Sequence, residues 1–315
     1  MTDIPIHEAM MAPRAAWKVA PVLSQIRWSG FLGYALLAPS LIFLGLFTYG
    51  PIAQLMADSL FVRKGIGAAT EFAGLTNYKA VLADPSFHHA LVNNVIFAVL
   101  TVVPSLVLSL FLAMALVHST RVNSALRAVF FFPVLVPLVA AASLFLFVFL
   151  PGVGLIDHYL ARFFVNPPNW LGNPDIALYS LIGVTIWKNA GYYMLFFLAG
   201  LQSVPPDAYE AAYLDGASPW QRLKYVTLPY LKPTIAFVAV ISLLNIITQV
   251  DHVFVLTKGG PSESTSLVLF YIYQQAVESY DIGKASAATF ISLLALLGIT
   301  LTSLRTLERS FGGAA

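Results

Sequence analysis

The amino-acid sequence predicts an all-α membrane protein with six transmembrane helices. Hydrophobic residues make up 58% of the 315 residues and charged residues only 10%, which lies outside the range of a soluble globular domain. A helix that crosses a bilayer needs about 20 mostly apolar residues. The chain has six long stretches without Asp, Glu, Lys or Arg, and a chain of this length cannot hide six such helices from water.

The six spans are predicted where these uncharged stretches lie. In order, they are Phe31–Tyr49, Leu91–Val117, Val129–Leu150, Ile176–Gly200, Ile235–Leu256 and Ala285–Leu304. Four prolines fall inside spans, where we expect kinks: Pro39, Pro104, Pro133 and Pro137. Residues 31–304 are interpreted as one membrane domain between cytoplasmic tails at 1–30 and 305–315. The first tail lacks the short apolar core and the cleavage site of a signal peptide.

The distribution of basic residues predicts that both chain ends are cytoplasmic. With that orientation, ten Lys and Arg residues lie in cytoplasmic segments and six in segments on the opposite side. The polar loop at 201–233 is then cytoplasmic. The 257–284 connection, on the other side, is predicted to open with a turn and continue as an amphipathic helix from Leu267. A second short helix is expected around Tyr78.

The loop at 201–233 has the residue pattern of two short helices joined by a glycine. Pro206 is tolerated at a helix opening, and Glu210 lies in the first turn, where the helix dipole favours negative charge. Gly216 suits the left-handed residue that follows a helix end. Ser218 and Gln221 then form a predicted capping box at the start of the second helix.

Two spans carry polar side chains at helical spacing. The stripe of the fourth span consists of Thr185, Lys188, Asn189 and Tyr192. The stripe of the fifth span consists of Asn245, Thr248, Gln249 and His252, with Asp251 beside it. Such stripes favour a pathway for a hydrophilic solute, because a charged residue such as Lys188 needs a cavity or a partner inside a membrane. The alternative is that these residues only hydrogen-bond the helices together.

Motifs for catalysis and metal binding are missing. The sequence contains no Gly-x-x-x-x-Gly-Lys-Ser/Thr phosphate-binding loop, no His-Glu-x-x-His and no cysteine. His88 and His89 are adjacent rather than one helical turn apart, so they do not predict a zinc site. The basic residues form no stripe that would bind nucleic acid. We therefore predict neither catalytic residues nor a metal or cofactor bound by this chain.

The loop at 201–233 also resembles the docking loop of ABC-importer membrane subunits. Glu210-Ala211-Ala212 is followed after three residues by Gly216, and after nine more by Val226-Thr227-Leu228-Pro229. The family usually has Ile where Val226 stands. Leu201-Gln202-Ser203-Val204-Pro205 and Leu256-Thr257-Lys258-Gly259-Gly260-Pro261 are further matches. From about residue 31 onward, the chain is similar to permeases of maltose and glycerol-3-phosphate importers.

This resemblance implies a type I ABC importer permease fold and alternating access in the bacterial cytoplasmic membrane. It implies as partners two copies of an ATPase that uses ATP and Mg, a second homologous permease, and an extracytoplasmic binding protein. The coupling residues carried over from the family are Glu210, Ala211, Ala212, Asp215, Gly216, Leu228 and Pro229. The family's sugar-contacting positions correspond to Thr185, Lys188, Asn189 and Tyr192, and lie near Thr248 and Gln249. The stripe of the fifth span adds Asn245 and Asp251 to the predicted solute pathway.

Two alternatives stay open from the residues alone. A transporter driven by an ion gradient would use Asp251 and His252 as a proton relay, although it leaves the docking loop unexplained. A membrane enzyme is less supported, because no acid, base or nucleophile constellation emerges. The solute's charge also stays open: Lys188 favours an anion, but similar permeases for neutral sugars have a Trp-Lys pair at this position.

Overall fold

The computed structural model describes residues 30–62, 70–162 and 167–312. The predicted N-terminal tail, apart from its last residue, lies outside these ranges. The chain divides into two compact units, residues 1–53 and 54–315. Helix α1 (Gly30–Leu44) of the first unit passes through a π-helical turn, η2 (Gly45–Tyr49), into α2 (Gly50–Ser59). The helix therefore continues beyond the end predicted at Tyr49, and its apolar side chains from Tyr34 to Tyr49 are mostly exposed.

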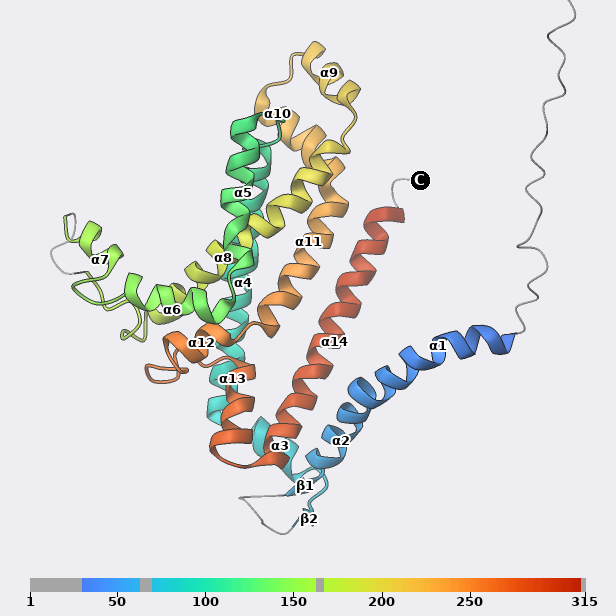
Figure 1. The fold of residues 1–315 in the computed structure, drawn as a ribbon, viewed down its shortest axis with the longest axis vertical. Helices are drawn as coiled ribbons and strands as arrows, with labels where there is room; N and C mark the ends of the chain where they lie inside the picture. Colours follow the sequence, from blue (N-terminus) through green and yellow to red (C-terminus); the bar gives the residue numbers. More distant parts are fainter. Residues whose placement is uncertain (1–29, 63–69, 163–166, 313–315) are drawn as a thin grey trace, which may run out of the picture. The chain divides into compact units, whose positions relative to one another are not determined.

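The second unit is a helical bundle with a two-stranded ribbon (Figure 1). Strands β1 (Phe61–Val62) and β2 (Glu71–Phe72) pair antiparallel, with Phe61 opposite Phe72. The helices up to the predicted docking loop are α3 (Thr76–Leu82), α4 (Pro85–Ala115), α5 (Arg121–Leu135), α6 (Leu138–Val148), α7 (Leu155–Leu160) and α8 (Ala177–Gln202). Those that follow are α9 (Pro206–Leu214), α10 (Pro219–Arg222), η3 (Leu223–Thr227), α11 (Leu228–Thr248), α12 (Asp251–Leu256), α13 (Val268–Tyr273), η4 (Gln274–Glu278) and α14 (Ile282–Gly312).

Four helical stretches of the described residues are long and apolar enough to cross a membrane. They are Tyr34–Ser59, Pro85–Ala115, Pro219–Leu256 and Ile282–Thr302, and α5 with α6 would make a fifth as one bent span. Helix α8 has 26 residues but is not among them, since Lys188 and Asn189 interrupt its apolar sequence. The count of six spans thus stays a prediction. Helix α14 also continues to Gly312, through the start of the predicted C-terminal tail.

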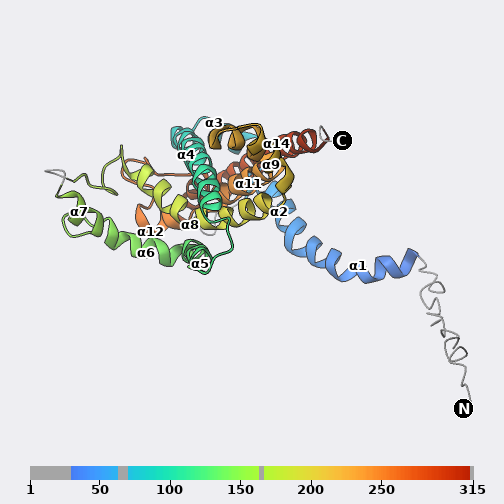
Figure 2. The ribbon, with the colours of Figure 1, turned by 90° about the horizontal axis from the view of Figure 1, so that it is seen from above.

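The predicted third span is not one helix. Helices α5 and α6 meet at an angle of 100°, and both views show α6 running sideways from the end of α5 toward α7 (Figures 1 and 2). Val136 is extended (φ −79°, ψ 127°), as expected for a residue before proline. Pro137 has no N–H with which to continue the hydrogen bonds of α5. The expected kink is therefore a sharp break at this dipeptide. We call residues 133–137, which are the end of α5 and this dipeptide, the first interruption.

The predicted fifth span is also interrupted. Helix α11 ends at Thr248, Gln249 is extended (φ −86°, ψ 107°), and α12 begins at Asp251. We call residues 249–250 the second interruption. The two short helices that follow the interruptions, α6 and α12, pack against each other. An uninterrupted helix would have placed His252 on the polar stripe of Asn245, and the interruption removes it from that stripe.

Helix α4 packs against α8 and α11, and α8 also packs against α5 and α11. A cluster near the interruptions includes Phe97 and Leu181, and a cluster toward the docking loop includes Tyr193 and Leu231. A third cluster joins α3, α4, α13 and α14 around Tyr271 at the end farthest from α9. The expected helices in the two long connections are present as α3 and α13. The connection between α6 and α8 contains the short helix α7.

An ion pair closes the end of the bundle farthest from α9. Asp84 caps α4 by accepting the Ser86 N–H at 2.9 Å, and it also accepts hydrogen bonds from Lys284 Nζ at 2.6 Å and Tyr271 Oη at 2.7 Å. Burial alone raises the pKa of Asp84, but the hydrogen bonds from Lys284, Tyr271 and Ser86 outweigh it and lower this pKa below its ordinary value. The carboxylate thus joins α4 to α13 and α14.

Acid should weaken this junction. Because the folded-state pKa of Asp84 is lowered, its stabilisation is fully present above the ordinary aspartate pKa of about 4 and is lost as pH falls through the folded value. We expect Asp84→Asn to lower the unfolding free energy at pH 7 by on the order of 2 kcal/mol. Thermal unfolding of the purified complex should show that the difference between wild type and variant shrinks on acidification. A difference that is constant down to pH 3 would contradict the assignment.

Candidate functional site

The loop between α8 and α11 has the two short helices that its sequence predicts. Pro205 and Pro206 open α9, and Asp215 follows its end. The Ser218 hydroxyl accepts the Gln221 N–H at 3.3 Å, and the Gln221 side chain accepts the Ser218 N–H at 2.7 Å, which completes the capping box. Gly216 between the helices has φ +73°. We call α9 and α10 the docking helices.

An open hollow of about 330 Å³ lies between the docking helices, and we call it the docking hollow. It is lined by Tyr209, Glu210, Tyr213, Leu214 and Arg222. Leu214 is 85% exposed and Tyr213 71% exposed, so large apolar groups surround a carboxylate and a guanidinium. Surfaces of this composition are typical of protein interfaces.

Arg222 is a residue of the docking hollow that the sequence did not single out. Its guanidinium lies 6.0 Å from the Tyr213 ring centroid, and its Nε is buried without a hydrogen-bond partner in the described part of the chain. Its position at the last residue of α10, one turn after the capping serine, was the signal available in the sequence.

The other predicted coupling residues do not all belong to the hollow. Ala211 is exposed on α9 and Ala212 is half-buried, while Asp215 is exposed after the helix end. Leu228 and Pro229 are the first two residues of α11, beyond the π-helical turn η3. They lie at the base of the docking loop, where a displacement of the loop would be transmitted to α11.

A hydrogen bond joins the first docking helix to that base. Tyr209 Oη lies 3.0 Å from Thr227 Oγ1, and the Thr227 hydroxyl also donates to the Arg222 carbonyl. Tyr209 packs with Val226 against the apolar cluster that contains Leu231. The docking helices are therefore attached to α11 by both polar and apolar contacts.

Tyr209→Phe should loosen this attachment. We expect it to cost about 1 kcal/mol of local stability, since one hydrogen bond is lost and the ring stays. Hydrogen exchange of the backbone amides in η3 should become faster in the variant. Tyr213→Phe is the control, because its ring is exposed and no hydrogen bond to its hydroxyl is found within the described residues. Equal exchange rates in the two variants would show that this hydrogen bond does not stabilise η3.

The two polar stripes meet at one level of the bundle. Asn189 Nδ2 donates to Gln249 Oε1 at 3.2 Å, and Asn245 Nδ2 donates to Tyr193 Oη at 3.4 Å. Tyr193, whose ring is fully buried, was missed because it lies one residue beyond the helical spacing of the stripe, which ends at Tyr192. Only the pairing across helices shows its role.

Thr185 and Lys188 face the packed interior of this chain. The Thr185 hydroxyl donates to the Leu181 carbonyl at 2.9 Å and is fully buried. Lys188 is 7% exposed, and its ammonium group donates to the carbonyls of Val136 at 2.6 Å, Pro133 at 3.3 Å and Val134 at 3.4 Å. The partner that a charged residue needs inside a membrane is therefore the backbone of the first interruption.

The remaining stripe residues are more accessible. Tyr192 and Gln249 are half-buried, whereas Thr248 and Asp251 are exposed. His252 is fully buried and stacks on Phe97 at 5.4 Å, and neither of its nitrogens has a hydrogen-bond partner among the described residues. Asp251 and His252 thus occupy opposite environments and do not form the hydrogen-bonded pair that a proton relay needs.

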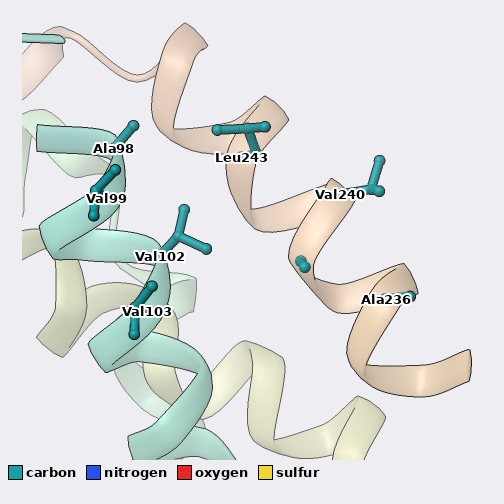
Figure 3. A pocket seen from close by; sticks show the side chains of 8 residues that line it. Ala98, Val99, Val102, Val103, Ala236, Val240 and Leu243 are labelled. Atoms are coloured by element: carbon teal, nitrogen blue, oxygen red, sulfur yellow. The ribbon is translucent and has the colours of Figure 1, made fainter. Parts of the chain in front are cut away.

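A separate hollow of about 310 Å³ lies between α4 and α11 (Figure 3). Its lining consists only of alanine, valine and leucine side chains: Ala98, Val99, Val102, Val103, Ala236, Ala239, Val240 and Leu243. No side chain in it can replace the hydrogen bonds that a polar solute makes with water. This hollow is therefore not the candidate pathway.

Comparison with known proteins identifies the class of the chain. Residues 92–308 match the family described as "Binding-protein-dependent transport system inner membrane component". The chain belongs to this family. It is the inner-membrane permease of a binding-protein-dependent ABC importer, and ATP hydrolysis in this class is done by a separate subunit.

Individual relatives cover nearly the whole chain. A probable ABC transporter permease, YurN of Bacillus subtilis strain 168, is 33% identical over 86% of this chain and 94% of its own length. The sn-glycerol-3-phosphate permease UgpA of Yersinia enterocolitica is 31% identical over 89% of this chain and 95% of its own. A solved bacterial ABC transporter that imports the acidic polysaccharide alginate matches with a TM-score of 0.77 and 25% identity. That match covers 89% of this chain and 96% of the solved one. The type I importer permease fold predicted from the sequence is thus confirmed.

Proposed function

We propose that this permease carries a sugar or a sugar-like polar solute across the cytoplasmic membrane by alternating access. Two of its relatives are named for glycerol phosphate and for alginate, which are a phosphorylated polyol and a polysaccharide. The observation that carries the proposal is the docking hollow, in which Glu210 and Arg222 stand among exposed aromatic and aliphatic side chains.

The partners we propose follow from that surface and from the family. Two copies of an ATPase bind ATP and Mg and hold the docking helices, one copy on this chain and one on a second, homologous permease. An extracytoplasmic binding protein delivers the solute at the other side. Closure of the ATPase pair draws the docking helices together, and α8 and α11, which begin or end at the docking loop, transmit the movement. In this scheme Glu210 and Gly216 transmit the movement of the ATPase and take part in no chemical step.

The solute pathway is proposed at the level where the two stripes meet. Tyr192, Asn245, Thr248 and Gln249 offer neutral donors, acceptors and an aromatic face, the groups that recognise hydroxyl-rich solutes. Asn189 is 5% exposed and donates to the Gln249 side chain, so it holds that side chain in place. Two interrupted helices at the same level support this location, because irregular backbone inside a membrane occurs where it is buried in protein or lines a cavity.

Two measurements test this function. The cognate binding protein is screened by thermal shift against neutral sugars, polyols, glycerol phosphate and sulfonated sugars, and the stabilising compound is then used in uptake assays. Gln249→Leu should lower uptake at least about tenfold with ATPase assembly intact, because a half-buried hydrogen-bonding group is removed from the pathway. Leu297→Ala, at an exposed position of α14, is a control that alters no polar side chain. Uptake of Gln249→Leu at the wild-type rate would reduce the stripe to a contact that holds the bundle together.

A further inference from the structure

The two helix interruptions are linked through consecutive residues of one helix. Helix α8 places Lys188 at the first interruption and Asn189 at the second. The same helix ends at Gln202, four residues before α9 begins at Pro206, so it leads directly into the docking helices. A displacement of the docking helices along α8 therefore reaches both interruptions through these two side chains.

At the first interruption, backbone carbonyls are available to accept hydrogen bonds from a cation. Pro137 has no N–H, so the carbonyl of Pro133 accepts the Val136 N–H at 3.3 Å in place of the helical bond from residue 137, and it also accepts a hydrogen bond from Lys188. The Lys188 ammonium has three donors, and three carbonyls of the interruption accept them. A positive charge at a helix C-terminus is also favoured by the helix dipole.

The surroundings fix Lys188 in this place. Its neighbour Trp187 packs edge-on against Phe145 of α6 at 5.1 Å, so the same turn of α8 contacts both sides of the bend. Three residues after Lys188, Gly191 allows α8 to approach the backbone of α5 at Phe130. The ammonium group is thus enclosed between α8 and the bend, and Lys188 is only 7% exposed.

At the second interruption, the contact is made by amides. Asn189 donates to the Gln249 side chain, which stands on the extended residue between α11 and α12. The Thr248 hydroxyl donates to the carbonyls of Leu244 and Asn245, so the end of α11 is satisfied locally. Asn189 is then the side chain through which α8 holds this break.

We propose that Lys188 and Asn189 are positioning residues that couple the docking helices to the two interruptions, and that Lys188 does not contact the solute. The inference rests on the proposed function, since it assigns the joint by which ATPase movement reshapes the pathway. In this arrangement the solute meets neutral amides, a hydroxyl and an aromatic ring, while Lys188 donates its hydrogen bonds to backbone carbonyls.

The test measures cysteine labelling, so it needs no identified solute. The sequence has no cysteine, and an introduced cysteine is therefore the one labelling site in this chain. Thr248→Cys is introduced as an exposed reporter in the full complex with its ATPase and second permease. Its labelling rate with a small cationic methanethiosulfonate reagent is measured without nucleotide and after trapping with ATP and vanadate. We expect the trapped state to change this rate by about tenfold. Addition of Lys188→Met should reduce the change to less than about twofold while ATP hydrolysis persists, and Lys188→Arg should restore it.

Each outcome decides a different claim. A Lys188→Met complex that keeps the full nucleotide-dependent change overturns the inference. If that variant does not assemble, Asn189→Leu carries the same test at the second interruption. Lys188→Cys should resist the reagent in both states, and rapid labelling there would place Lys188 in the aqueous pathway and also overturn the inference. If the reporter complex with native Lys188 shows no nucleotide-dependent change, the proposed alternating access itself fails.

Discussion

Gly216→Val is expected to abolish solute uptake while the affinity of the binding protein for its solute stays unchanged. Gly216 joins the docking helices at φ +73°, where a β-branched residue is strained by about 1–3 kcal/mol. An added Cβ meets no atom within 4 Å, so the effect comes from the backbone conformation and not from a clash. The helices would leave the orientation that forms the docking hollow, and the ATPase would lose its contact.

The matched control is Gly298→Val in α14. Gly298 also has open space around an added Cβ, but its backbone is helical and it lies outside the docking loop. Uptake by reconstituted vesicles and co-purification of the ATPase are measured for both variants. Full uptake by Gly216→Val would show that this glycine is not needed for coupling.

Gly191→Ala is expected to prevent assembly of the membrane domain. A Cβ at Gly191 would lie 1.8 Å from the Phe130 carbonyl oxygen and 2.5 Å from its carbon. Both are backbone atoms of α5, so they cannot rotate away as a side chain would, and α8 must separate from α5. Overpacking of this kind costs about 1–3 kcal/mol or more, and separation would also pull Lys188 from its three carbonyls.

The control for this change lies on the same helix. Gly183 is exposed, and an added Cβ there meets nothing within 4 Å. Gly183→Ala should give normal amounts of a monodisperse complex in detergent, whereas Gly191→Ala should give aggregated or degraded protein. Equal yields and equal melting temperatures of the two variants would mean that α5 and α8 are not in close contact.

The features that could be predicted from the sequence are those set by local rules. The docking helices follow from Pro206, Gly216 and the capping box of Ser218 with Gln221, each of which acts within a few residues. The apolar spans follow from length and composition. The break near Pro137 was foreseen only as a kink, because the size of a bend depends on what packs against it.

The parts that could not be predicted depend on long-range contacts. Helical spacing placed Lys188 on a polar stripe, but its partners lie more than 50 residues earlier, at a break that the spacing does not reveal. No proline or glycine near Thr248 indicates that α11 ends there, so the sequence analysis placed His252 on a continuous helix. Tyr193 became a candidate only through its hydrogen bond with Asn245, and Arg222 only through its place in the docking hollow.

The central claim is that this chain imports solute only as part of an ATP-driven complex. The direct measurement is uptake into vesicles that contain the complex with its ATPase and second permease, with solute-loaded binding protein outside and ATP inside. The account predicts uptake that needs both ATP and the binding protein, and that persists when an ionophore collapses the proton gradient. Uptake by this chain alone, without ATP and abolished by the ionophore, would contradict it.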